Sequence, residues 1–138
     1  MSDKNISASV LAVLITICTA TPAVAHHSFA AEFDINQPIK LHGEVMSMVF
    51  SNPHSRIYLR VKTESGEIQE WTIEGGAPNS LIRRGWNRNS LPAGTEVTVL
   101  GYRARDGSFS ASGGTVMLPD GSSLSVNTNS YTGETGKE

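Results

Sequence analysis

The chain has 138 residues, 38% of them hydrophobic and 17% charged, which is typical of a single globular domain. Eleven Lys and Arg residues stand against thirteen Asp and Glu residues, so the chain lacks the basic excess that nucleic-acid binding requires. Four histidines and one cysteine are too few for a cysteine-based zinc module or an iron–sulfur cluster.

The N-terminus has the parts of a secretory signal peptide. Residues 10–20 form an apolar stretch, Pro22 ends it, and residues 23–25 form a small-residue cleavage site. The stretch is much shorter than the roughly 20 residues that cross a bilayer. We therefore expect residues 1–25 to be removed on export to the periplasm or the medium, which leaves no membrane span.

The predicted mature chain begins at His26 and keeps 113 of the 138 residues. The only cysteine, Cys18, leaves with the signal, so core packing rather than a disulfide must hold the fold. A domain of this size buries about two-thirds of its unfolded surface, which is sufficient. Ile17 occupies the position before Cys18 where a lipoprotein signal needs a small residue, which argues against a lipid anchor.

Residues 39–50 are predicted to form the first strand, because apolar side chains recur there with a period of two. The apolar face is expected to hold Ile39, Leu41, Val45 and Val49. Gly43, in the middle of the strand, predicts a bulge or a sharp coil. A turn is expected at residues 51–54.

Two further strands are predicted after this turn. The second has Ile57, Leu59 and Val61 on its inward face, and Tyr58 and Arg60 on its outward face. The third covers residues 68–74, in which Trp71 and Ile73 share one face and Glu70 and Glu74 share the other.

The second half of the chain predicts a short helix and more strands. The helix covers residues 80–86, where Leu81, Ile82 and Trp86 are expected to cover one end of a barrel. A fourth strand starts at Thr95, and a closing hairpin pairs residues 115–118 with 124–126 around a turn at 119–121. The polar tail, residues 127–138, is predicted to be disordered.

Three strands, a short helix and two or three more strands are the order of elements in the OB-fold. We therefore predict an all-β chain with one short helix, in which residues 26–126 form a small OB-like Greek-key β-barrel. Another small barrel or a β-sandwich is the alternative. A closed barrel buries its strand edges, so we expect a monomer.

The candidate metal ligands are the four histidines, which all lie in one part of the chain: His26, His27, His42 and His54. After cleavage, the α-amine and the ring Nδ1 of His26 can close a chelate ring on one metal ion. A second imidazole completes a three-nitrogen site in one plane, which suits Cu(II). This arrangement is called a histidine brace in copper oxygenases and copper carriers.

His54 is the preferred second imidazole, because it follows Pro53 in a tight turn that restricts the backbone. His27 is also a candidate, since the first two residues of a chain can both reach one ion. His42 lies on the polar face of the first strand. Each histidine also has a simpler interpretation. His26 and His27 would be part of a soluble, flexible start of the chain, His54 a hydrogen-bonding turn residue and His42 a solvated strand residue.

We expect a protein that binds rather than transforms its ligand, and we assign no catalytic residue. The competing hypothesis is a metal-free module that binds a peptide, a glycan or a periplasmic protein on the face around Tyr58 and Arg60. The two hypotheses differ in one requirement, because only copper binding needs the free amine of His26. A metal-dependent oxidase is a third class, which would need an open coordination position and a substrate surface.

Several motifs in the mature chain resemble those of one protein family. They are residues 26–34 (HHSFAAEFD), 43–45 (GEV), 52–54 (NPH), 71–74 (WTIE), 81–86 (LIRRGW) and 101–108 (GYRARDGS). In this order they resemble the small exported bacterial proteins grouped as domain of unknown function 6152. The resemblance covers nearly the whole mature chain. It implies an exported bacterial protein, and it brings no established activity, cofactor or catalytic residue.

Overall fold

The structure, a computed structural model, describes residues 29–127. The predicted signal peptide, the start of the predicted mature chain and residues 128–138 of the predicted tail lie outside these residues. The described part has six strands: β1 (Phe33–Val49), β2 (Arg56–Lys62), β3 (Ile68–Glu74), β4 (Glu96–Ala104), β5 (Ser110–Met117) and β6 (Ser123–Ser125). The short helix α2 (Pro78–Arg83) and a helical turn at residues 29–32 complete it. The all-β prediction is therefore confirmed.

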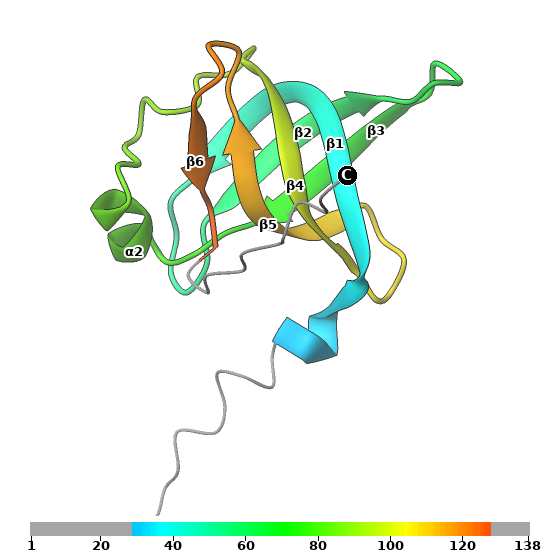
Figure 1. Ribbon diagram of the computed structural model, residues 1–138, viewed down its shortest axis with the longest axis horizontal. Coiled ribbons are helices and arrows are strands. Elements are labelled where there is room, and N and C mark those ends of the chain that lie inside the picture. The colour runs from blue at the N-terminus through cyan, green and yellow to red at the C-terminus, as the bar shows by residue number, and fades with distance from the viewer. Residues whose placement is uncertain (1–28, 128–138) are drawn as a thin grey trace, which may run out of the picture.

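The strands form one sheet in the order β3-β2-β1-β4-β5-β6, and all neighbours in this order are antiparallel. The end of β3 also pairs in parallel with the start of β5. Strand β1 bends across the sheet (Figure 1), and its first half pairs with β4 while its second half pairs with β2. No helix in the described part of the chain is long and apolar enough to cross a membrane.

Strand β1 differs from its prediction in length and in phase. It begins at Phe33 instead of residue 39, and its register against β2 shifts between Val45 and Ser47 rather than at Gly43. The extra residue reverses the inward and outward positions that follow. Val49 is therefore 45% exposed, whereas Met48 packs against the core.

Gly43 has a different role from the predicted bulge. It pairs regularly with Val61 of β2 and Val97 of β4. A Cβ atom at this position would collide with the carbonyl oxygen of Arg60. The glycine is therefore needed because the backbone of β2 approaches closely, not because the strand is irregular there.

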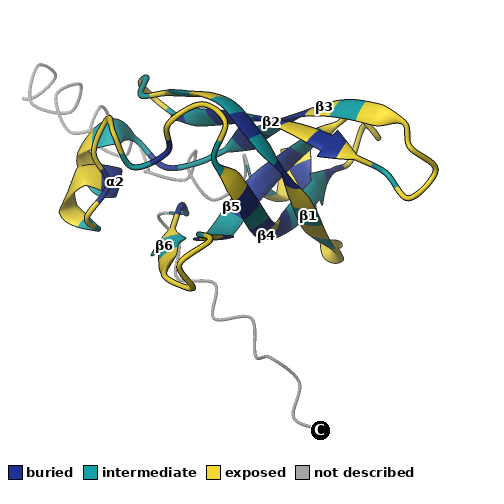
Figure 2. Cartoon of the chain, turned by 90° about the horizontal axis from the view of Figure 1, so that it is seen from above, coloured by how far each residue is buried: buried dark blue, intermediate teal, exposed yellow. Residues whose placement is uncertain are grey.

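The core lies between the bent strands and α2, and its buried stretches lie toward the middle of the domain (Figure 2). Trp71 and Trp86 are 5% and 1% exposed, so both belong to the core. The expectation that Ile82 covers the core is wrong, because its side chain is 57% exposed. Leu81 faces inward, and the next helical residue is turned by about 100°, so Ile82 faces the solvent.

Helix α2 begins two residues before the predicted start, with Pro78 in its first turn, and ends at Arg83. Proline is favoured there because its missing N–H has no partner within the helix. The predicted closing hairpin is confirmed by the pairing of Val116 with Leu124. Strand β5 begins at Ser110, five residues earlier than predicted. The sequence does not indicate this start, because the first half of the strand is rich in Ser and Gly and has no apolar alternation.

Candidate functional site

His54 lies in the turn between β1 and β2, and hydrogen bonds on both sides hold its backbone. The hydroxyl of Ser51 donates a hydrogen bond of 2.7 Å to the carbonyl oxygen of His54. The next residue, Ser55, donates its N–H to the carbonyl oxygen of Gly76 at 3.0 Å and accepts the N–H of Gly75 at 2.8 Å. The turn is thus tied to the chain that follows β3.

The ring of His54 forms an ion pair with Glu74, the last residue of β3. Nδ1 of His54 lies 2.5 Å from Oε1 of Glu74, and the two side chains are 44% and 19% exposed. Among residues 29–127, Nε2 of His54 has no hydrogen-bond partner. A carboxylate that accepts the proton of Nδ1 fixes the ring and leaves the lone pair of Nε2 available, as in the histidine ligands of metal sites.

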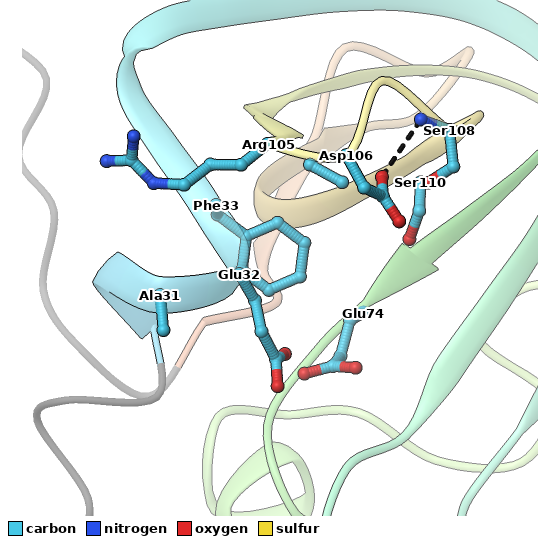
Figure 3. Close-up of a pocket in the computed structure, with 9 residues that line it drawn as sticks. Ala31, Glu32, Phe33, Glu74, Arg105, Asp106, Ser108 and Ser110 are labelled. Carbon is cyan, nitrogen blue, oxygen red and sulfur yellow. Dashed lines mark hydrogen bonds between the residues drawn. The ribbon is translucent and has the colours of Figure 1, made fainter.

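Glu74 also lines an open pocket of about 310 Å³. The pocket is shown in Figure 3, and its lining residues are Ala31, Glu32, Phe33, Glu74, Ala104, Arg105, Asp106, Ser108 and Ser110. One wall is therefore the start of the described chain, and the opposite wall is the turn between β4 and β5. The N-terminal segment and Glu74, the partner of His54, therefore line the same pocket.

Arg105 holds the N-terminal segment against this end of the sheet. Its backbone N–H donates to the carbonyl oxygen of Glu32 at 2.9 Å, and its Nε donates to that of Ala30 at 2.8 Å. Its guanidinium also lies 3.7 Å from the carboxylate of Asp34. On the other side of the segment, the ring of Phe29 lies edge-on to Tyr102, with ring centroids 6.3 Å apart.

The pocket carries negative charge. In Figure 3, Glu32 and Glu74 turn their carboxylates toward each other, while the side chain of Arg105 points away from them. Asp106 lies in the facing turn, where hydrogen bonds from the side chain and the backbone N–H of Ser108 hold the pKa of its carboxyl below the ordinary value. Facing carboxylates repel each other, so this pocket favours a cation.

His42, the other described histidine, has partners of its own on β4. Its Nδ1 lies 3.2 Å from Oγ1 of Thr98, and its Nε2 lies 3.1 Å from Oε2 of Glu96. His42 lies in the middle of β1, whereas His54 follows the end of that strand, so the structure does not bring the two rings together. His26 and His27 lie outside the described residues.

Glu74 is the site residue that sequence reasoning missed. The strand pattern indicates only that Glu74 shares a face with Glu70, and nothing in its neighbourhood in sequence points to His54. The antiparallel pairing of β2 and β3 places Arg56 opposite Glu74, which brings Glu74 beside the turn that carries His54. In residues 29–127, no group of three His, Cys, Asp or Glu side chains is arranged to hold a metal ion.

The face around Tyr58 and Arg60 is the site of the competing hypothesis. Tyr58 is half-buried on β2, and Arg60 lies 3.9 Å from the carboxylate of Glu44 on the neighbouring strand. The pair of Arg60 and Glu44 gives this face both a positive and a negative charge. The pocket of Glu74 is not lined by Tyr58 or Arg60.

The comparisons with known proteins identify a family and no activity. The comparison with curated proteins gives no match, and the comparison with solved structures gives none either. The model of the Family of unknown function (DUF6152) matches residues 13–114, which is more than half of the chain. The histidine turn at 52–54, Glu74 and Arg105 all lie within the matched residues. The chain therefore belongs to the Family of unknown function (DUF6152).

Proposed function

We propose that this is an exported, periplasmic protein that binds Cu(II) through a mature N-terminal His26 and through His54. The α-amine and Nδ1 of His26 supply two nitrogen ligands, and Nε2 of His54 supplies the third. Cu(II) prefers such tetragonal nitrogen sites, and an α-amine titrates near neutral pH, so it can lose its proton and bind the ion.

The observation that carries the proposal is the position of Glu74 between His54 and the N-terminal segment. Glu74 forms the ion pair with His54 and lines the same pocket as Glu32. Glu32 lies in the helical turn at residues 29–32, so three residues, 26–28, lead from this turn to the predicted N-terminal amine. An extended chain of three residues spans about 10 Å, so His26 stays close to the pocket. The facing carboxylates of Glu32 and Glu74 further favour a divalent cation.

His27 has the same reach as His26 and is a secondary ligand in this proposal. His42 is assigned no ligand role, because Glu96 and Thr98 occupy its ring nitrogens. The proposal describes a carrier or a binding site, and it requires no catalytic residue.

We also propose that the sheet is an OB-like Greek-key barrel and that the protein is a monomer. The support is the order of pairings, in which β1, β2, β3, β5 and β4 follow one another and β4 returns to β1. Such a circuit leaves few free strand edges for another chain. In an OB-like barrel the turn after β1 and the turn between β4 and β5 lie in the region where ligands bind.

The test is native mass spectrometry of the protein exported to a periplasm, purified without chelator and titrated with one equivalent of Cu(II). We expect a mass that begins at His26 and one retained copper ion. His54→Ala and a variant with Ala inserted before His26 should each lose the ion. His42→Ala is the matched control and should keep it.

Three results would contradict the proposal. A different N-terminus would remove the amine chelate, and full copper retention in the Ala-insertion variant would show that the amine is not a ligand. Copper-free protein that begins at His26 would turn the search to protein or small-molecule partners. The face around Tyr58 and Arg60 has no specific contact that favours such a partner, so we advance no second function.

A further inference from the structure

A second pocket, of about 270 Å³, lies beside α2. Its lining residues are Phe50, Pro78, Ile82, Trp86, Asn87 and Arg88. It shares no lining residue with the pocket of Glu74. The two pockets are therefore distinct sites.

The floor of this pocket is apolar and rigid. Trp86 is 1% exposed, and its Nε1 donates a hydrogen bond of 2.8 Å to the carbonyl oxygen of Ser125, which fixes the indole. Phe50 packs against the core. Ile82 stands at the side with 57% of its surface exposed, the largest value among the exposed large hydrophobic residues of the described chain. Covering an apolar surface of this kind with a ligand removes it from water, which lowers the free energy of the complex.

The charge at the rim is positive. Arg88 is the only ionisable residue that lines the pocket, and Arg83 follows Ile82 on α2. Both side chains are exposed, and neither forms an ion pair within residues 29–127. Arg84 differs, because its guanidinium binds the hydroxyl of Ser125 and the carbonyl oxygen of Asn127. Arg88 is thus the one charged residue in the lining of a mainly apolar cavity, and this lining holds no acidic residue.

We propose that this pocket binds a small amphiphilic carboxylate, with its alkyl chain against Trp86 and Ile82 and its carboxylate on Arg88. Binding pockets for small molecules are mainly apolar and carry a few polar groups that set the orientation of the ligand. A guanidinium is the group that best matches a carboxylate, because it donates two parallel hydrogen bonds. The concave shape favours one inserted chain over a flat membrane surface, which meets protruding side chains instead.

The test is a titration of the full mature protein with monomeric decanoate, followed by the two tryptophan indole N–H signals in NMR spectra. We expect the signal of Trp86 to shift. The signal of Trp71 should stay in place, since Trp71 contacts Phe109 and Arg103 elsewhere in the fold. Arg88→Gln should weaken decanoate binding by about tenfold or more, because it removes a charged hydrogen-bond partner.

Lys62→Gln is the matched control, since it removes an exposed positive charge far from α2 and should leave the affinity unchanged. Decanol, which has the same chain and no charge, should bind equally to the wild type and to Arg88→Gln. Equal decanoate affinity in the wild type and in Arg88→Gln would overturn the proposal. So would binding to anionic phospholipid vesicles without any shift by monomeric decanoate, which would identify a membrane surface instead.

Discussion

Nδ1 of His54, in the turn after β1, lies 2.5 Å from Oε1 of Glu74 at the end of β3. This pair gives the imidazole one anchored nitrogen and one free nitrogen. It also connects the only histidine of the described turn to the pocket against which the N-terminal segment lies.

Replacing Glu74 with Gln should weaken Cu(II) binding by about 10- to 100-fold, the range found when the carboxylate behind a histidine ligand is lost. The amide keeps the shape of the side chain and removes the negative charge that orients the ring. Competition of the protein with a coloured Cu(II) chelator measures the affinity. Glu70→Gln is the control, because Glu70 is exposed on the same strand. Equal affinity in the two variants would show that the pair has no part in binding.

Replacing Arg105 with Ala should also weaken Cu(II) binding, by several-fold, because Arg105 holds the segment that leads to His26. The change removes the hydrogen bond to Ala30 and the ion pair with Asp34. The free energy of unfolding should fall only slightly, since the side chain of Arg105 is 46% exposed and ion pairs of exposed side chains contribute little to stability. Urea unfolding and the copper competition measure the two effects. An unchanged copper affinity would mean that this anchor does not position the ligand.

Gly43→Ala should destabilise the protein by about 1–3 kcal/mol or more, because the new Cβ atom collides with the carbonyl oxygen of Arg60. Gly114→Ala is the milder control, since the nearest atom, the carbonyl oxygen of Leu100, is 3.3 Å from the added Cβ. Urea unfolding gives both values. Equal stability in the two variants would show that β2 can move away from β1 at little cost.

Acid should destabilise the protein through three aspartates: Asp34 near the start of β1, and Asp106 and Asp120 in turns. The pKa of each is held below 3.8, chiefly by hydrogen bonds from Asn36, Ser108 and Ser122 respectively. A lowered pKa in the folded state means that each contribution to stability is complete above about pH 4 and is lost as the pH falls through the folded pKa.

Urea midpoints measured from pH 5 to pH 2.5 test this expectation. The turn between β5 and β6 gives the simplest variant, because Asp120 accepts hydrogen bonds from both the N–H and the hydroxyl of Ser122. Asp120→Asn should lower the stability at pH 5 and reduce its fall below pH 4. A parallel pH profile for wild type and variant would contradict the assignment.

Two strands and the core were predictable because their local pattern agrees with their final environment. Leu59 on β2 and Ile73 on β3 alternate with polar residues and are fully buried. The second half of β1 was mispredicted because its bulge depends on the partner strand. The early start of β5 depends in the same way on pairing with β4, since its Ser and Gly residues carry no apolar signal of their own.

The all-β class and the apolar faces of β2 and β3 follow from the sequence alone, and His54 as a copper ligand stays a prediction. Each depends on neighbours along the chain, which set periodicity and turn chemistry. The pairing of Glu74 with His54, the close approach of β2 to Gly43 and the pocket that Ile82 lines with Arg88 are visible in the folded chain alone. These contacts join residues that are far apart in sequence. They depend on strand register and on the phase of the helix, which are set by the packing of the whole sheet.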